Sequence, residues 1–345
     1  MNSISFLSRF TFSSSRRNFM KIVIPDDYPP VISGTIHLER LKELGEVEVY
    51  KSRPRDEEEL LRRIEDADIV VNIRAYCKFP SNILTAATKL KLISIWGVGS
   101  DNVDLDAARE LGIPVTTTPG TATESVAEHT LALMLAVARK IPLIDKQVKD
   151  GKWIRGLVTQ LYGKTVGVIG TGAIGCHFAR LASGIGMNVM AWSFHPSDEK
   201  ARAIGFKYVS LEQLLKESDV VSIHLRLSEK TEAFIGKREF ALMKPTAFLI
   251  NTARGAIVDR EALIDALRMG RIAWAGLDVY HEEPLDPGDP ILDLDNTVLT
   301  PHSAGQTPEV LDKGLGMAVE NVANFLSGRL TNLVNPPIRP KWMNH

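Results

Sequence analysis

Three polar side chains in the last third of the chain are of types that bind a carboxylate and transfer a proton. Arg254 stands in "LINTARGAIVD", Glu283 in "GLDVYHEEPL" and His302 in "LTPHSAG", and each follows a run of residues typical of a β-strand. An arginine fork fits a carboxylate, a histidine transfers a proton near neutral pH, and a carboxylate can orient that histidine. Because successive parallel strands end at one sheet edge, we expect these side chains to converge on one crevice.

An earlier segment has the features of a phosphate-binding turn. "VGVIGTGAIG" places Gly170, Gly172 and Gly175 after an apolar strand and before the helical segment "AIGCHFARLA". In this order the glycines permit a tight turn, close approach of the backbone to a pyrophosphate, and close packing of the helix on the strand. The free N–H groups at the start of the helix then face the phosphates. The segment therefore predicts a dinucleotide site.

The residue that selects between dinucleotides is unusual. Ser193 stands eighteen residues after Gly175, where sites selective for NAD carry an acid that binds the ribose and repels a 2′-phosphate. Serine repels neither cofactor, and Arg226 can pair with the extra phosphate. Asp198 and Glu199 follow closely and would oppose that phosphate if they face the site. The sequence therefore leaves the choice between NAD and NADP open.

The elements that must position these residues alternate between strands and helices. The strand-like segments of a first series are 21–25, 47–50, 68–71, 92–96 and 114–117, separated by segments with helical spacing of apolar residues. A long helix begins near Glu124 and ends before Pro142, a second strand series extends from Lys164 to residue 300, and a last amphipathic helix covers roughly 308–326. This alternation predicts parallel sheets covered on both faces by helices.

This organisation predicts an α/β protein of two doubly wound parallel-sheet domains. We expect residues 20–119 and 306–345 to form the first domain, and residues 120–305 to form a dinucleotide-binding Rossmann domain inserted within it. Residues 1–19 contain many Ser and Arg residues and have two interpretations: a disordered leader, with translation starting at Met20, or a mitochondrial transit peptide. The first interpretation places the protein in the cytoplasm.

Composition narrows the classes of partner. The 345 residues carry 41 Lys and Arg against 42 Asp and Glu, a formal net charge of −1, so no electrostatic feature indicates a nucleic acid or a membrane surface. No apolar run approaches the ~18 residues that a membrane-spanning helix needs. Cys77 and Cys176 lie far apart without disulfide or metal-binding spacing, which predicts buried, reduced thiols and no metal site.

Together these motifs resemble the D-isomer-specific 2-hydroxyacid dehydrogenase family. The resemblance extends from Met20 to about Pro337 and rests on "GVGSDNVD", "TPGTATESVAEH", the glycine turn, "NTARG", "GLDVYHEEP" and "TPHSAG". It implies a flavodoxin-like substrate domain, an inserted Rossmann domain, and a homodimer built around the long helix. It also implies hydride transfer between NAD or NADP and C2 of a small 2-oxo or 2-hydroxy acid, such as glyoxylate or hydroxypyruvate.

The resemblance also implies a role for each matching residue. Arg254 would bind the substrate carboxylate, His302 would donate the proton to the developing alkoxide, and Glu283 would orient His302 and favour its charged form. Glu282 is the lesser candidate, because the family partner stands immediately before the proline. Asp278 would contact the nicotinamide carboxamide. The residues implied to bind the cofactor are Gly170, Gly172, Ala173, Ile174, Gly175, Ser193, Leu225, Arg226, Thr231, Thr252, Ala253, Asp278, Ala304 and Gly305, and those implied to bind the substrate are Arg74, Val98 and Gly99.

Two alternatives stay open on the sequence alone. A phosphorylated substrate, as in 3-phosphoglycerate dehydrogenase, fits the same constellation. A dinucleotide-sensing corepressor shares the fold and can keep the same three side chains, although the near-neutral charge disfavours it. Outside the constellation, we expect His129 and His224 to serve packing or hydrogen bonding.

Overall fold

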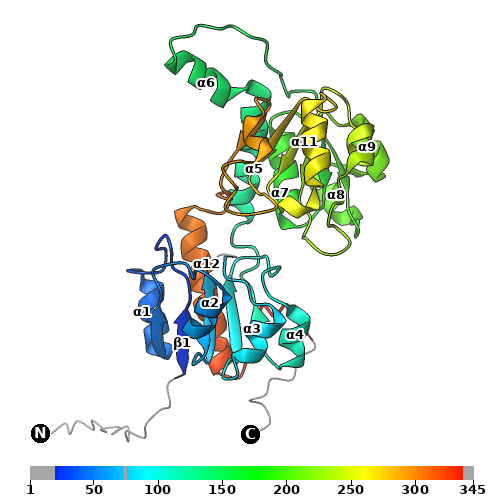
Figure 1. Cartoon of the computed structure of the whole chain (residues 1–345). Coiled ribbons are helices and arrows are strands. Elements are labelled where there is room, and N and C mark those ends of the chain that lie inside the picture. The colour runs from blue at the N-terminus through cyan, green and yellow to red at the C-terminus, as the bar shows by residue number, and fades with distance from the viewer. Residues whose placement is uncertain (1–19, 74–75, 337–345) are drawn as a thin grey trace, which may run out of the picture. The chain divides into compact units, whose positions relative to one another are not determined.

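The computed structural model describes residues 20–73 and 76–336, and the chain forms two units (Figure 1). Unit 1 takes the described residues up to Trp96, Asn102–Thr117 and the described residues from Met317. Unit 2 takes Gly97–Asp101 and Thr118–Gly316. Arg74, which was predicted to bind the substrate, and the predicted leader of residues 1–19 lie outside the described residues.

Unit 1 is built on a five-stranded parallel sheet with strand order β2-β1-β3-β4-β5, which is the flavodoxin-like order. Strands β3 and β4 are buried along their whole length, as expected where helices cover both faces of a sheet. The elements are β1 (Lys21–Ile24), α1 (Ile36–Leu44), β2 (Glu46–Val49), α2 (Glu57–Ile64), β3 (Ile69–Ile73), α3 (Ser81–Ala86), β4 (Leu92–Trp96), α4 (Leu105–Glu110), β5 (Val115–Thr116) and the later part of α12 (Pro308–Leu326).

Unit 2 is built on a seven-stranded parallel sheet with strand order β12-β11-β10-β9-β6-β7-β8. The order reverses between β6 and β9, and sheets of this type bind ligands outside the carboxyl ends of their strands at such a point. The elements are α5 (Thr123–Arg139), α6 (Ile141–Lys149), β6 (Thr165–Ile169), α7 (Ala173–Gly184), β7 (Asn188–Trp192), α8 (Asp198–Ile204), β8 (Lys207–Tyr208), α9 (Leu211–Glu217), β9 (Val220–Ile223), α10 (Lys237–Leu242), β10 (Phe248–Asn251), the 3-10 turn η1 (Gly255–Ile257), α11 (Arg260–Arg268), β11 (Trp274–Leu277), η2 (Pro290–Asp293) and β12 (Thr297–Leu299).

Helix α5 lies across one face of this second sheet, against β10, β11 and α7. Its buried apolar residues recur at helical spacing and include Ala127, Leu133, Met134 and Val137, which join one core with the apolar face of α7. The first turn of α5 is thereby brought to the edge of the sheet where β10, β11 and β12 end.

The predicted fold class, two doubly wound parallel-sheet domains, is confirmed. The predicted strands 92–96 and 188–192 and the predicted helix 308–326 have the observed bounds. Helix α6 was not predicted. The long helix ends at Arg139, Lys140 takes a left-handed φ of 52°, and a new helix begins with Pro142 in its first turn, where proline needs no hydrogen bond.

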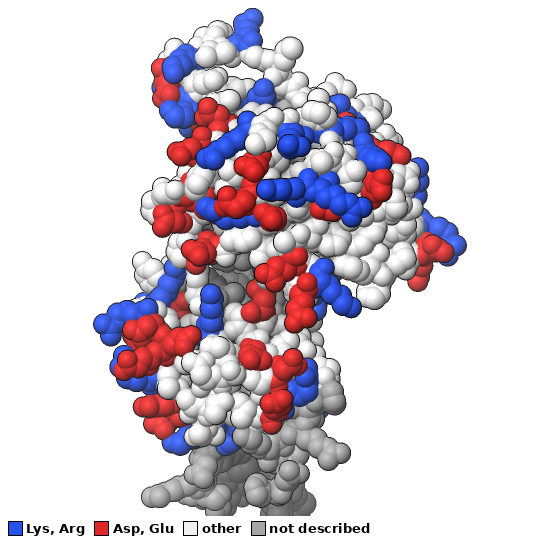
Figure 2. All heavy atoms as spheres, turned by 45° about the vertical axis from the view of Figure 1, so that its right-hand side comes forward, with Lys and Arg blue, Asp and Glu red and all other residues white. Residues whose placement is uncertain are grey.

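The surfaces of both units carry mixed charge. On the face shown in Figure 2, acidic and basic side chains are interspersed, and several form i,i+4 ion pairs along helices, such as Arg62 with Glu58 and Lys216 with Glu212. In the part of the chain that the structure describes, no helix is both long and apolar enough to cross a membrane. Both cysteines are buried and unpaired, as predicted.

Candidate active site

The carboxyl edge of the unit 2 sheet gathers most of the predicted site residues. Gly170 follows β6, Ser193 follows β7, Leu225 and Arg226 follow β9, and the segment with Arg254 follows β10. Asp278 directly follows β11, and His302 lies three residues beyond the end of β12. Since all these strands are parallel, their carboxyl ends share one edge, and one ligand can touch residues far apart in the sequence.

Arg254 is held by its own loop and by an acid that the sequence analysis did not single out. Asn251 at the end of β10 accepts the Ala253 N–H and donates to the Arg254 carbonyl oxygen, at 3.0 and 2.9 Å. The Arg254 Nε and Nη2 groups each lie 3.2 Å from Asp101 Oδ1. A Cβ at Gly99 would clash with the Arg254 guanidinium in its observed position, so a larger residue there would displace the guanidinium. The motif "GVGSDNVD" contained Asp101, but a spacing argument could not show its partner.

His302 and Glu283 form a short polar contact. His302 Nδ1 lies 2.6 Å from Glu283 Oε2, and the Tyr280 N–H donates to Glu283 Oε1 at 3.0 Å. The neighbouring Glu282 is exposed and lines the cavity described below. With Nδ1 directed at Glu283, the other ring nitrogen of His302 is available for proton transfer.

Asp101 connects this pair with Arg254. Burial raises the pKa of Asp101, but the positive charges of Arg254 and His302 outweigh burial, so its pKa is below the usual range. Arg254, Glu283 and His302 also follow the neighbouring parallel strands β10, β11 and β12, so the guanidinium and the His302–Glu283 pair lie at the same edge of the sheet. A carboxylate-binding guanidinium beside an oriented imidazole can bind a 2-oxo acid and protonate its carbonyl oxygen.

Asp278 is fully buried, and both of its oxygens accept hydrogen bonds from the protein. Oδ1 accepts from Thr300 Oγ1 at 2.6 Å and from the Ser303 N–H at 2.8 Å, and Oδ2 accepts from the Ala304 N–H at 3.0 Å. Burial raises the pKa of Asp278, but these hydrogen bonds and one from His129 lower the pKa by more than burial raises it. The net pKa is therefore below its usual value, and the group is a carboxylate. Its side chain therefore fixes the loop that carries His302.

The glycine turn fits a dinucleotide pyrophosphate. Gly170 has φ of 100°, and a Cβ there would lie 2.5 Å from the His224 carbonyl oxygen. A Cβ at Gly175 would clash with the Gly170 carbonyl, so α7 can approach the strand only with glycine there. At Gly172, by contrast, a Cβ would meet nothing within 4 Å. Gly172 caps α7 without a side-chain hydrogen bond, so the N–H groups of Ala173 and Ile174 are offered at the helix start.

The remaining predicted cofactor residues surround the same edge. Ser193 is half-buried, and its Oγ accepts the His195 N–H at 3.2 Å. Arg226 is exposed, and it forms no ion pair with any residue in 20–73 or 76–336. Thr231 Oγ1 donates to the Arg226 carbonyl at 2.6 Å, and Thr252 is buried against Thr130 of α5. Gly305 follows the Asp278-bound Ala304.

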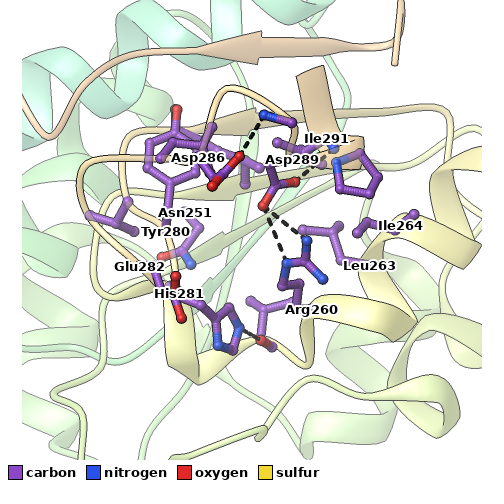
Figure 3. Close-up of a pocket in the computed structure, with 17 residues that line it drawn as sticks. Asn251, Arg260, Leu263, Ile264, Tyr280, His281, Glu282, Asp286, Asp289 and Ile291 are labelled. Atoms are coloured by element: carbon purple, nitrogen blue, oxygen red, sulfur yellow. Dashed lines mark hydrogen bonds and ion pairs between the residues drawn. The ribbon is translucent and has the colours of Figure 1, made fainter. Parts of the chain in front are cut away.

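A cavity of about 440 Å³ lies beside the loop that carries Glu283 (Figure 3). Tyr280 and Glu282 of this loop line it together with Gly255 and residues of α11. Arg260 of α11 pairs with Asp289 at 3.0 Å, which ties the loop to the helix. A Cβ at Gly255 would clash with the Tyr280 main chain. The loops that carry Arg254 and Glu283 are therefore in direct contact.

A Rossmann sheet with this turn and this acid–base pair defines a class, the nicotinamide-dependent oxidoreductases. The family model described as "D-isomer specific 2-hydroxyacid dehydrogenase, NAD binding domain" matches residues 131–304. The chain belongs to this family, which confirms the resemblance predicted from the motifs.

Two relatives of similar identity have different activities in their names. The chain is 42% identical over 309 residues to the glyoxylate reductase of Aeropyrum pernix, covering 86% of this chain and 92% of the relative. It is also 42% identical over 326 residues to the D-3-phosphoglycerate dehydrogenase of Archaeoglobus fulgidus, covering 93% of this chain and 60% of that relative.

Two solved structures with similar folds hold different dinucleotides. An acyclic imino acid reductase in complex with NADPH and D-Arg matches with a TM-score of 0.83 and 30% identity, covering 91% of this chain and all of the other. A D-lactate dehydrogenase from Aquifex aeolicus, complexed with NAD and lactic acid, matches with a TM-score of 0.81 and 32% identity, covering 92% and 99%. The chain thus uses a nicotinamide dinucleotide, and the relatives do not decide which one.

Proposed function

We propose that this protein reduces small, unphosphorylated 2-oxo acids of the glyoxylate and hydroxypyruvate type. The observation that carries the proposal is the His302–Glu283 contact of 2.6 Å, formed after strands β11 and β12, next to the strand β10 that precedes Arg254. Near-complete coverage of the glyoxylate reductase of Aeropyrum pernix supports the substrate class. The sensing alternative is disfavoured because a sensor needs no oriented acid–base pair.

The proposed roles follow from the charge of each group. The bound cofactor supplies a hydride to C2 of the oxo acid. Arg254 binds the substrate carboxylate through its planar fork, and the main-chain N–H groups of Val98 and Gly99 assist it. His302 protonates the oxygen that becomes the alkoxide, and Glu283 stabilises the imidazolium before that transfer. In the oxidation direction His302 removes the same proton.

We infer that the adenosine end of the site accepts NADPH as well as NADH. No carboxylate stands at Ser193 to repel a 2′-phosphate, and the charge of Arg226 is unpaired within the described part of the chain. An unpaired guanidinium and a hydroxyl are both donors to a phosphate. The nicotinamide half is identical in the two cofactors, so the proposal concerns only the adenosine end.

We further propose a homodimer in which α6 and the segment after it contact a second copy of the chain. Helix α6 buries none of its residues, and Figure 1 shows it and the following segment standing away from the sheet of unit 2. This segment, called the arm and comprising residues 141–158, carries Trp153 at 77% exposure and Leu157 at 93%. Large apolar side chains so exposed are typical of a protein interface.

The experiment that tests the function is steady-state reduction of glyoxylate, hydroxypyruvate and phosphohydroxypyruvate with NADH and with NADPH. We expect the two unphosphorylated acids to have the higher kcat/KM. His302→Ala should lower kcat at least about 100-fold while sparing dinucleotide binding. Preference for phosphohydroxypyruvate would instead support the phosphorylated alternative. Tight dinucleotide binding without turnover of any of the three acids would support a sensor.

A further inference from the structure

Helix α5 holds both ends of the loop that carries the proposed acid. Ser125 Oγ donates to the Ala304 carbonyl oxygen at 2.6 Å, beyond His302 in the sequence. His129, one turn later on α5, has Nε2 3.0 Å from Thr300 Oγ1, before His302 in the sequence. Residues four apart lie on the same side of a helix, so one side of α5 contacts residues 300 and 304 together.

The directions of the hydrogen bonds around His129 can be assigned. Asp278 is a carboxylate and only accepts, and Thr300 Oγ1 lies 2.6 Å from its Oδ1. The single hydroxyl proton of Thr300 is therefore directed at Asp278. Thr300 Oγ1 must then accept at its 3.0 Å contact with His129, so the proton of that contact is on His129 Nε2. His129 Nε2 also lies 3.4 Å from Asp278 Oδ1.

The backbone that Asp278 holds has an uncommon conformation. His302 has φ of 52°, in the left-handed region that is unfavourable for a non-glycine residue. The His302 N–H donates to the Asp278 main-chain oxygen at 2.8 Å, and the Asp278 side chain accepts the next two N–H groups, of Ser303 and Ala304. These bonds offset the cost and fix the direction in which the His302 ring leaves the backbone.

We propose that His129 is a positioning residue for proton transfer by His302. It donates through Nε2 to Thr300, keeps the Thr300–Asp278 pair in register, and so maintains the backbone that directs His302 at Glu283. His129 contributes no proton to the reaction. The inference rests on the proposed function, in which His302 is the acid, and it goes beyond the packing role that the sequence suggested for His129.

Three variants separate positioning from packing. His129→Leu removes the donor but keeps an apolar side chain in the helix, whereas His129→Gln returns an amide N–H near the place of Nε2. Glu128→Gln changes an exposed neighbour on the same helix and is the matched control. We expect His129→Leu to lower kcat for glyoxylate by about 10- to 100-fold, because small misplacements of a catalytic group cost rate. KM for glyoxylate and Kd for NADPH should stay within about twofold, since binding groups are intact.

Recovery of kcat by glutamine at residue 129 distinguishes a positioning role from a packing role. His129→Gln should recover most of kcat, and Glu128→Gln should match the wild type. The proposal is overturned if His129→Leu retains the wild-type kcat, if kcat, KM and Kd deteriorate together, or if glutamine restores nothing that leucine lost.

A second readout is independent of turnover. In protein labelled with ¹⁵N-histidine, NMR should show His129 as the tautomer protonated on Nε2, and His129→Leu should shift the His302 ring signals while Glu128→Gln leaves them in place. A wild-type protein that reduces none of the oxo acids would refute the proposed function, and the NMR result would then decide the placement of His302 by itself. An Nδ1-protonated His129, or His302 signals unmoved in His129→Leu, would refute the positioning role.

Discussion

At the scale of single residues, the charge on Arg254 is shared before any substrate arrives. Its Nε and Nη2 groups lie 3.2 Å from Asp101 Oδ1, and the same carboxylate lies within the electrostatic reach of His302. A substrate carboxylate must therefore share or displace Asp101 at the guanidinium.

The proposed use of NADPH also rests on single residues. We expect Ser193→Asp to lower kcat/KM with NADPH at least tenfold, about 1.4 kcal/mol, because the new carboxylate repels a 2′-phosphate. The value with NADH should change little or improve. Ser193→Ala, which removes the hydroxyl without adding charge, is the control and should still use NADPH. Equal losses with both cofactors in Ser193→Asp would contradict the assignment.

A buried histidine gives the fold a pH dependence. His224 follows β9, its ring packs on Phe178 with centroids 5.1 Å apart, and its Nδ1 is fully enclosed even though the residue as a whole is half-buried. Burial lowers the pKa of His224 to about 3. The unfolded chain, with a histidine pKa of about 6.5, therefore binds a proton that the folded chain excludes between these pH values.

The stabilisation from neutral His224 is accordingly present above pH 6.5 and is lost as the pH falls toward 3. The slope should reach at most about 1.4 kcal/mol per pH unit. His224→Gln should lack this contribution, which urea unfolding of both proteins from pH 7 to pH 4 would measure. A difference in unfolding free energy that stays constant over this range would show that His224 does not titrate as proposed.

At the scale of elements, the catalytic groups depend on loops that contact each other. Gly255 of η1 touches the Tyr280 main chain, and the Tyr280 N–H holds Glu283. Because the neighbour is backbone rather than a flexible side chain, a methyl group at residue 255 must displace one of the two loops. Replacing one hydrogen of Gly255 with a methyl group can thus displace the His302–Glu283 pair without contacting it.

We therefore expect Gly255→Ala to lower kcat/KM about 100-fold, through misplacement of Arg254, Glu283 or both. Gly184→Ala is the matched control, because a Cβ there meets nothing within 4 Å, and its activity should equal that of the wild type. Steady-state kinetics and a thermal melt of both variants would measure this. Wild-type activity in Gly255→Ala would mean that the loops separate without consequence for the site.

At the scale of the whole molecule, the arm of residues 141–158 is the feature that one chain alone does not explain. Its exposed residues include Ile141, Trp153 and Leu157, and no residue of α6 is buried. Exposing so much apolar surface to water is unfavourable by roughly 25 cal/mol per Å². A second copy that covers this surface would recover that free energy.

We expect the wild-type protein to be a dimer at micromolar concentration in sedimentation velocity, and Leu157→Asp to shift it toward the monomer. A carboxylate buried in an apolar interface without a partner is strongly destabilising. Met269→Asp, at another exposed apolar position of unit 2, is the control and should remain dimeric. A wild-type monomer, or equal dissociation of the two variants, would refute the arm as the interface.

The sequence by itself determined the local elements and the chemistry of individual motifs. Strand–helix alternation specified parallel sheets, and the glycine spacing specified the turn before α7, because these features depend on residues close together in the chain. Helix α6 was not predicted, because Pro142 is as typical of a position just after one helix as of the first turn of another helix.

Only the tertiary structure decided which distant side chains meet. Asp101 contacts Arg254 across 153 residues and His129 contacts Thr300 across 171, and neither pair has a signal in local spacing. The left-handed φ of His302 likewise follows from the bonds of Asp278 rather than from residue preference, since histidine alone does not favour it. Contacts of this kind arise when parallel strands bring their carboxyl ends to one edge, and their partners are set by strand order, which a single sequence does not state.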